Sequence, residues 1–422
     1  MPSRFGSLLR QRNFLFLSFA GAMSQLGDRL SHMLLITIIG LSAPGKLLAY
    51  SGGSLTFVLP TLLLSPIAGV LVDRWDKRQT IARTHLLQTA ILALTPIAIA
   101  FTHSFVPFWI AVTGFFALDI FNNTASPALL PSLVGRDDII TANSLNLFFA
   151  RIATVIGMVI GGFLIKWVGW QKGIWIDAAC HLSAALLVLN ITAIAIPQAP
   201  SRTPSMTTAR KNILGLTAHA FAQFFRELVE VVRLVFVNHL VAFVLASIVI
   251  ATFISAVSYT ILIFLIQQVL GMGTAGVGVF AGILAVGMIA GALLIGILPQ
   301  NINRPGIVAG VILVYGLLFF IGNWLITLWF MIVVALIAGV AFSWLGVLQN
   351  TILQEETAEN IRGRVFSTRE FITNATFLFT TLFIGALGDW TSYRTALMAI
   401  GISLILIGLG GTLWVHRLRQ QG

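Results

Sequence analysis

The sequence contains a single cysteine, Cys180, among its 422 residues. One cysteine excludes an internal disulfide and any metal site built from several thiolates. Charged residues are also scarce, at 9% of the chain against roughly 25% in a typical soluble domain. The motifs HExxH, GxSxG, CxxC and GxxxxGK(S/T) do not occur. The sequence therefore favours neither a metalloprotease, a serine hydrolase nor an ATP-driven pump, and we expect no enzymatic activity, no cofactor and no metal.

Apolar residues, by contrast, make up 58% of the chain. A membrane-spanning helix needs about 20 such residues, so the composition suffices for about a dozen spans and little else. We predict an all-α membrane protein with twelve transmembrane helices and no soluble domain before or after them. The expected spans are residues 13–40, 47–72, 80–101, 106–130, 143–166, 172–196, 240–268, 275–298, 306–322, 324–349, 367–387 and 395–415. The first span is too long for a cleavable signal peptide, so we expect it to be retained.

The net charge of +11 is distributed unevenly between the two sides of this predicted topology. Nineteen of the 25 Lys and Arg residues lie in or next to segments on the side of the two termini, and four lie on the opposite side. The positive-inside rule therefore places both termini in the cytoplasm of a cell (inner) membrane protein. The basic charge reflects topology, and we expect no nucleic-acid partner.

The longest polar break lies between the sixth and seventh spans. It begins with Pro197, Pro200 and Pro204, and residues 213–239 then show an amphipathic pattern typical of a helix on the membrane surface. We predict an N-terminal six-helix bundle at 1–196, a cytoplasmic linker with an amphipathic helix at 197–239, and a C-terminal six-helix bundle at 240–422.

An internal repeat supports this division. A shift of 223 residues aligns features of the two halves, as in a transporter built from two parallel bundles. The aligned positions are Leu129-Leu130 with Ile352-Leu353, Ser144 with Ser367, Gly162 with Gly385, and Trp167 with Trp390. The segment from Gly271 to Gly276 matches GxGxxG, but no strand precedes it, so we expect a turn between two spans.

The loop after the second span carries a recognisable pattern, Gly69-x-x-x-Asp73-Arg74-x-Asp76-Lys77-Arg78. It resembles the signature loop of the major facilitator superfamily, with Asp76 where that family usually has glycine. Because Asp is a good turn residue, we expect the turn to be kept. The resemblance implies a fold of two six-helix bundles around a central cavity. It also implies a cytoplasmic gate formed by Gly69, Asp73, Arg74, Lys77 and Arg78.

In that gate, Asp73 would face the positive N-terminal end of the eleventh span, near Ser367. The alternative is that the cations of this loop only obey the positive-inside rule, which would explain Lys77 and Arg78 but not the spacing of Gly69 and Asp73.

Further segments resemble a drug-exporter branch of this superfamily, which includes macrolide-efflux proteins and the enterobactin exporter. They are Ser24 to Asp28, Pro127-Ala128 through Ala142-Asn143, and Arg362 to Arg364. The lysophospholipid flippases share some of these elements. Gly157, Gly161 and Gly162 match the glycines of the fifth-helix antiporter motif without its proline, and we interpret them as helix-packing glycines.

The resemblance implies a secondary active transporter that exports amphipathic or hydrophobic small molecules, such as drugs or siderophore-like compounds, by alternating access and proton coupling. Two alternatives stay open, a lysophospholipid flippase without proton coupling and a non-transporting membrane sensor. The expected partners are the lipid bilayer, a small-molecule substrate and protons, and we expect a monomer.

Ionisable residues inside the spans are few, and such residues are costly in a bilayer and often functional. Candidates for proton coupling or for the substrate cavity are Asp28, Arg29, His32, Asp119, Asn122, Asn123 and Arg151. Asp28 and His32 share a helix face. We expect either a titrating or substrate-binding pair in the central cavity, or an internal Asp–His or Asp–Arg pair that closes the outer gate. An Asp119–Arg151 pair is plausible from depth, as a structural ion pair or as part of the site. For Asp177 and His181 of the sixth span we favour packing or rim solvation.

The predicted topology can be tested by cysteine labelling. After replacement of Cys180, a single cysteine at Arg78 or Arg202 should be shielded from an impermeant thiol reagent in intact cells, and one at Ser104 should react. Labelling at Arg202 but not at Ser104 would invert the topology.

Overall fold

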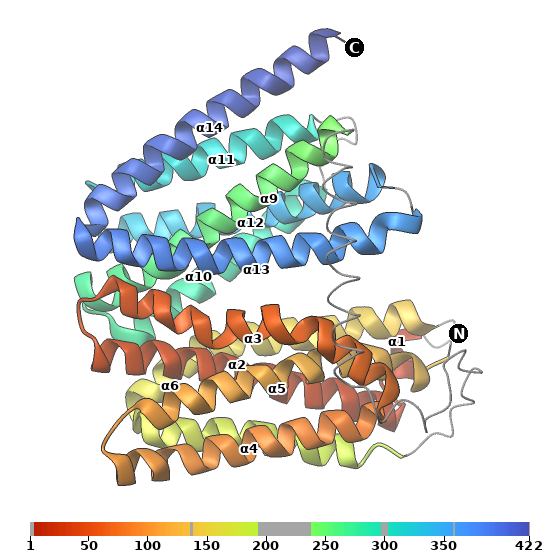
Figure 1. Cartoon of the computed structure of the whole chain (residues 1–422). Coiled ribbons are helices and arrows are strands. Elements are labelled where there is room, and N and C mark those ends of the chain that lie inside the picture. Colours follow the sequence, from red (N-terminus) through yellow and green to blue (C-terminus); the bar gives the residue numbers. More distant parts are fainter. Residues whose placement is uncertain (1–3, 136–137, 193–237, 297–302, 358, 422) are drawn as a thin grey trace. The chain divides into compact units, whose positions relative to one another are not determined.

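The computed structural model is helical in the residues that it describes, which are all except 1–3, 136–137, 193–237, 297–302, 358 and 422 (Figure 1). No strand occurs in that part of the chain. The predicted amphipathic helix at 213–239 lies outside it but for its last two residues. The helices are α1 (Arg4–Leu8), α2 (Arg12–Ser42), α3 (Leu47–Arg74), α4 (Lys77–Thr102), α5 (Val106–Leu129), η1 (Leu130–Ser132), α6 (Ile139–Leu189), α9 (His239–Val257), η3 (Ser258–Leu262), η4 (Leu265–Val269), α10 (Gly273–Gly296), α11 (Arg304–Gly322), α12 (Leu328–Glu355), α13 (Glu359–Trp390) and α14 (Tyr393–Gln421).

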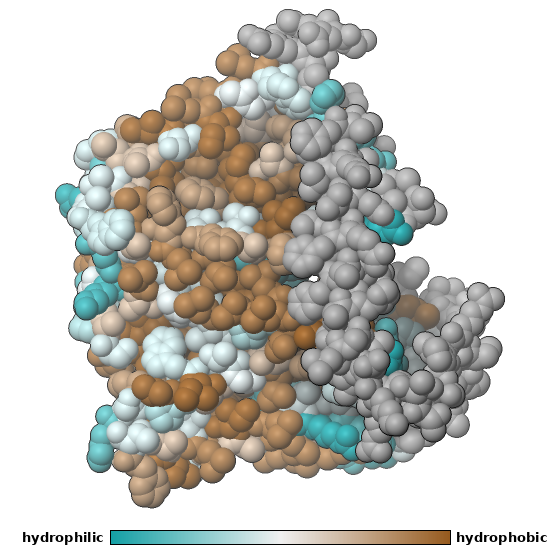
Figure 2. Space-filling view, viewed as in Figure 1, coloured by the Kyte–Doolittle hydropathy of each residue, from teal (hydrophilic) through white to brown (hydrophobic). Residues whose placement is uncertain are grey.

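Ten helices in the described residues are long and apolar enough to cross a membrane. One of them, Thr141–Leu189, has 49 residues and is broken at Gly169, whose φ of 82° and ψ of 162° are not helical. It therefore supplies the predicted fifth and sixth spans, and α2 coincides with the predicted first span. On the face that Figure 2 shows, apolar residues cover the middle of the helices and hydrophilic residues gather near their ends. The all-α membrane fold is confirmed.

Capping side chains set several helix ends. Asp76 accepts a hydrogen bond from the Gln79 N–H at 2.7 Å and so begins α4, as expected for a residue that favours turns. Thr327 caps α12, which starts at Leu328 and not at 324 as predicted. The helix α13 starts at Glu359, well before the predicted 367, because its first turns are polar and precede the apolar stretch from which the span was predicted.

The chain divides into two compact units, which we describe separately. Unit 1 comprises residues 1–38 and 59–225, and unit 2 comprises residues 39–58 and 226–422. In unit 1, α4 packs along both α5 and α6. In unit 2, α11 packs along α14, α10 along α12, and α9 along α13 (Figure 1).

Residues 39–58 belong to unit 2 although they precede the linker. The Asp389 carboxylate at the end of α13 accepts hydrogen bonds from the Leu47 and Leu48 N–H groups, at 2.7 and 3.2 Å, and so caps the start of α3. The Tyr50 hydroxyl donates to Gln267 Oε1 at 2.6 Å. A carboxylate at a helix N-terminus is stabilised both by these free N–H groups and by the helix dipole.

Positions related by the 223-residue shift occupy equivalent environments in the two units. Leu129 and Leu130 lie in the apolar core of unit 1, and Ile352 and Leu353 lie in that of unit 2. The aligned tryptophans, Trp167 and Trp390, are instead 78% and 85% exposed. Tryptophan is favoured where a helix meets the membrane–water interface, so both halves place it at such a boundary.

Candidate functional site

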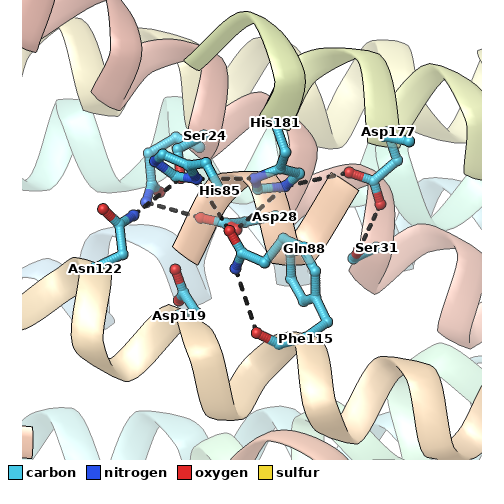
Figure 3. A network of polar contacts seen from close by, with 12 residues as sticks. Ser24, Asp28, Ser31, His85, Gln88, Phe115, Asp119, Asn122, Asp177 and His181 are labelled. Carbon is cyan, nitrogen blue, oxygen red and sulfur yellow. Dashed lines mark hydrogen bonds and ion pairs between the residues drawn. The ribbon is translucent and has the colours of Figure 1, made fainter. Parts of the chain in front are cut away.

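Polar side chains from four helices meet inside unit 1 (Figure 3). Buried polar atoms normally have hydrogen-bond partners, because an unpaired one loses its hydration without replacement. Among the described residues, six ionisable side chains keep a buried nitrogen or oxygen atom without such a partner. Five of the six lie in this cluster, namely Asp28, Arg29, Asp119, Asp177 and His181. This concentration marks the cluster as the candidate functional site.

The helix α2 contributes Asp28, which is 3% exposed. Its Oδ2 accepts a hydrogen bond from Gln25 Nε2 at 3.2 Å, whereas its Oδ1 has no hydrogen-bond partner. His181 of α6 lies beside this oxygen, with its Nε2 3.9 Å from Asp28 Oδ1. Asp28 is therefore placed where a proton or a further donor would complete its hydrogen bonding.

The helix α6 contributes Asp177 and His181, both fully buried. Since they are four residues apart, they share one helix face, and His181 Nε2 lies 3.4 Å from Asp177 Oδ1. The other oxygen, Asp177 Oδ2, accepts a hydrogen bond from the Ser31 hydroxyl at 2.5 Å. Of the two roles expected for this pair, packing and rim solvation, the complete burial of both side chains excludes rim solvation and agrees with packing.

The helix α4 adds two residues that the sequence analysis missed, His85 and Gln88. His85 Nδ1 lies 3.0 Å from Gln88 Oε1 and 3.3 Å from His181 Nδ1, and both side chains are buried. Gln88 Nε2 donates to the Phe115 carbonyl at 3.3 Å. Two polar residues three positions apart in a predicted span were the signal available in the sequence.

The helix α5 brings Asp119, Asn122 and Asn123 to the same region. Asn123 Nδ2 donates to Asp119 Oδ2 at 2.7 Å, and Asn122 Nδ2 donates to the Ser24 hydroxyl of α2 at 3.4 Å. Asp119 Oδ1 is buried without a hydrogen-bond partner.

The predicted Asp119–Arg151 pair does not form. The described ion pairs do not include it, and the Arg151 side chain is exposed. Depth along neighbouring helices was insufficient evidence, because the rotation of each helix decides which residues face one another.

Arg29 and His32 extend the site along α2. The stem of Arg29 passes Gly157 of α6, where an added Cβ would lie 2.9 Å from Arg29 Cβ. The His32 ring packs against Phe116, with ring centroids 4.9 Å apart.

The predicted packing glycines let α6 approach α2 closely. An added Cβ at Gly161 would lie 3.1 Å from Leu30 Cδ2, and Gly162 is buried beside it. Gly27 of α2 does the same from the other side, because a Cβ there would overlap the His181 ring and Asp177 Oδ1. Small residues of this kind permit close contacts between membrane helices.

The signature loop is held to unit 1 by its cations. Arg78 donates from Nε to the Val188 carbonyl at 3.3 Å and from a terminal nitrogen to the Leu189 carbonyl at 2.5 Å, and so caps the end of α6. Lys77 Nζ donates to the Asp73 carbonyl at 2.9 Å. The side chains of Asp73 and Arg74 are exposed, and an added Cβ at Gly69 would meet no neighbour within 4 Å.

No group of three or more His, Cys, Asp or Glu side chains in the described ranges could hold a metal ion. Three aspartates and two histidines of unit 1 lie close together in Figure 3, namely Asp28, Asp119, Asp177, His85 and His181.

Comparison with known proteins agrees with this description. The sequence model of the Major Facilitator Superfamily matches residues 17–372 and, in a second match, residues 248–421. The Enterobactin exporter EntS of Salmonella typhimurium is 26% identical over 372 residues, which cover 84% of this chain and 80% of that protein. The uncharacterized MFS-type transporter YkuC of Bacillus subtilis is 26% identical over 189 residues, or 43% of this chain and 42% of that protein.

Solved structures show the same fold. A bacterial homologue of the human lysosomal transporter Spinster has a TM-score of 0.70 at 13% identity, with 96% of each chain covered. A peptide transporter POT has a TM-score of 0.74 at 12% identity, with 96% of this chain and 95% of that chain covered.

The fold and the buried ionisable cluster define a polytopic membrane transporter. The chain belongs to the Major Facilitator Superfamily. It is accordingly a multi-pass protein of the lipid bilayer that moves a small-molecule substrate.

The contact between Gly27 and His181 gives a test of the site's packing. We expect Gly27→Ala to lower the midpoint of thermal denaturation in detergent, because overpacking of a tight contact costs about 1–3 kcal/mol. The matched control is Gly21→Ala on the same helix, where the added Cβ would meet only Asn146 Oδ1, at 3.9 Å. Equal midpoints for the two variants would show that the contact is not tight.

Proposed function

We propose that this protein exports amphipathic or hydrophobic small molecules from the cytoplasm and that an inward proton gradient drives the export. The observation that carries the proposal is a cluster of three carboxyl groups in unit 1 of a major facilitator protein, Asp28, Asp119 and Asp177, each with a buried oxygen that has no hydrogen-bond partner. One fixed cation, Arg29, accompanies these three carboxyl groups. Because an unpaired charge inside a membrane is costly, a neutralising proton is the natural partner for a surplus carboxylate.

The proton would act through alternating access. Protonation from outside would stabilise the state that faces the cytoplasm, and release inside would reset the carrier for its cargo. Asp28 is the first candidate for the coupling residue, since its Oδ1 is buried without a hydrogen-bond partner in the described structure. Asp119 is the second candidate, because its Oδ1 is also buried without a hydrogen-bond partner.

The substrate class follows from composition and from similarity. Few ionisable residues lie inside the spans, which suits a lipophilic or amphipathic ligand better than a highly charged one. One similar protein is named an enterobactin exporter. We therefore propose siderophore-like compounds and lipophilic drugs as the substrates to test first. We also propose a monomer whose bundles are residues 1–196 and 240–422, with both termini in the cytoplasm of the inner membrane.

The decisive experiment is uptake into inverted proteoliposomes with and without an imposed pH gradient. The panel comprises enterobactin, lipophilic cationic dyes and labelled lysophospholipids. Gradient-driven accumulation of enterobactin or a dye would support the proposal. Movement of lysophospholipid that ignores the gradient would indicate an uncoupled flippase, and binding without any transport would indicate a sensor.

Substitution of Asp28 should separate coupling from binding. Asp28→Asn mimics the protonated acid, so it should abolish gradient-driven accumulation and leave exchange at equal substrate concentrations partly intact. The control is Asp138→Asn, which removes a carboxylate at the start of α6, away from the cluster. Parallel loss of exchange and accumulation would instead assign Asp28 to substrate binding or to structure. Survival of both would point to Asp119 or to an uncoupled carrier.

The signature loop offers a matched pair of variants. We propose that Asp73 closes the cytoplasmic gate against a helix N-terminus, so Asp73→Asn should reduce transport several-fold while membrane insertion persists. Asp76→Asn removes the same charge from the same loop but preserves the cap of α4, because Asn also caps helices well. Equal transport rates for both variants and the wild type would show that the charges of this loop only set the membrane topology.

A further inference from the structure

A chain of hydrogen bonds in unit 1 leads from a backbone carbonyl to His181, which lies beside two carboxylates of the site (Figure 3). It runs from the Phe115 carbonyl to Gln88, from Gln88 to His85, and from His85 to His181. Each step joins buried atoms at 3.0–3.3 Å. The direction of donation along the chain can be deduced from chemistry alone.

The Phe115 carbonyl fixes the first step, because a carbonyl oxygen only accepts hydrogen bonds. The Gln88 amide must therefore present its nitrogen to Phe115, and its oxygen must face His85. An amide oxygen also only accepts, so His85 Nδ1 carries a hydrogen and donates it to Gln88 Oε1, 3.0 Å away.

The same nitrogen fixes the second histidine. His181 Nδ1 lies 3.3 Å from the protonated His85 Nδ1. The hydrogen on His85 Nδ1 is shared between Gln88 Oε1 and His181 Nδ1, and a protonated ring nitrogen has no lone pair with which to accept. A hydrogen on His181 Nδ1 would therefore point at a nitrogen that cannot accept it. His181 Nδ1 is therefore an acceptor, and the ring is neutral with its single hydrogen on Nε2.

That hydrogen points toward two carboxylates. His181 Nε2 lies 3.4 Å from Asp177 Oδ1 and 3.9 Å from Asp28 Oδ1, and neither contact has hydrogen-bond geometry in the described structure. The second oxygen of each carboxylate is already paired, Asp177 Oδ2 with Ser31 and Asp28 Oδ2 with Gln25. One N–H thus faces two acceptors and can bond fully to only one of them.

We infer that Gln88 and His85 are positioning residues that hold His181 as a neutral Nε2–H donor, and that this donor alternates between Asp28 and Asp177 according to whether Asp28 carries a proton. An ionised Asp28 takes the hydrogen bond, whereas a protonated Asp28 leaves it to Asp177. The coupling role rests on the proposed proton-driven export, but the tautomer does not.

The charged and titratable groups around Asp28 are consistent with a single exchangeable proton. Arg29 and His32 lie on the same helix, and His85 lies on α4. Asp119 lies on α5, while Asp177, His181 and Cys180 lie on α6. Three of these act on Asp28 electrostatically, namely Asp119, Arg29 and Asp177. Two of these groups are carboxylates and one is a guanidinium. The neutral His181 N–H is therefore the group that can change its hydrogen-bond partner when Asp28 gains or loses a proton, without changing its own charge.

The tautomer can be observed directly by nitrogen NMR of the full-length protein, labelled with 15N-histidine in lipid nanodiscs. Protonated and bare ring nitrogens have distinct resonances, and the His181→Gln variant assigns the His181 signals. We expect a bare Nδ1 and a protonated Nε2. A protonated Nδ1, alone or together with Nε2, would overturn the inference.

Variants at Gln88 test the positioning role. Gln88→Leu removes the acceptor for His85, so the single His181 tautomer should become a mixture. The control is Thr89→Val on the next position of α4, which removes hydrogen bonds to the His85 and Ala178 carbonyls without touching either ring. A single unchanged tautomer of His181 in Gln88→Leu would refute the positioning role of Gln88.

A transport readout separates this inference from the proposed function. In Gln88→Leu, the pH midpoint of gradient-driven transport should rise by about one to two units, because ionised Asp28 loses a hydrogen bond worth about 1.5–3 kcal/mol. Thr89→Val should leave the midpoint in place. Absence of gradient-driven transport in the wild type would refute proton-driven export and leave the tautomer standing. Driven transport with an unmoved midpoint in Gln88→Leu would refute the coupling role alone.

Discussion

A polar group inside a bilayer has no water to bond, so each one in this protein depends on a partner that the protein supplies. Most hydroxyl groups of the spans meet this constraint locally. Thr113 and Thr124, for example, donate to carbonyls one turn earlier on their own helix. A hydrogen bond to a carbonyl of the same helix is not sufficient for an ionisable group. In the part of the chain that the structure describes, the unpaired atoms of these groups gather almost entirely in one cluster of unit 1, which is where the proposed proton exchange would take place.

The distances within the cluster depend on how closely its helices approach. Gly27, Gly157 and Gly161 remove side chains from the contact between α2 and α6, and this brings the His181 ring against Asp28 and Asp177. An added Cβ at Gly27 would overlap His181 Nε2. One at Gly157 would lie 2.9 Å from Arg29 Cβ, and one at Gly161 would lie 3.1 Å from Leu30 Cδ2, so each of these neighbours would have to shift. Packing glycines and ionisable residues are therefore parts of one arrangement, although their chemistry is unrelated.

The cluster combines a fixed side with an adjustable side. Toward α4, a backbone carbonyl anchors Gln88 and His85 in defined orientations. Toward α2, Asp28 and Asp177 each have one oxygen held and one oxygen free of hydrogen bonds in the described structure. The proposed exchange of a proton would use both properties. The anchored side would preserve the geometry, and the two oxygens without hydrogen bonds would offer two alternative positions for one donor.

Much of this protein was predictable from its sequence. Apolar runs indicated the twelve spans, and the signature loop at residues 69–78 indicated the superfamily. The rarity of charge in the spans singled out Asp28 and Asp119. These features were predictable because the signals for them are local or compositional. Which ionisable residues meet was decided only by the tertiary structure. The predicted partner Arg151 faces outward, whereas His85 and His181, 96 positions apart in the sequence, lie in contact. Helix rotation and the kink at Gly169 determine those meetings, and both depend on packing between helices, which no single stretch of sequence encodes.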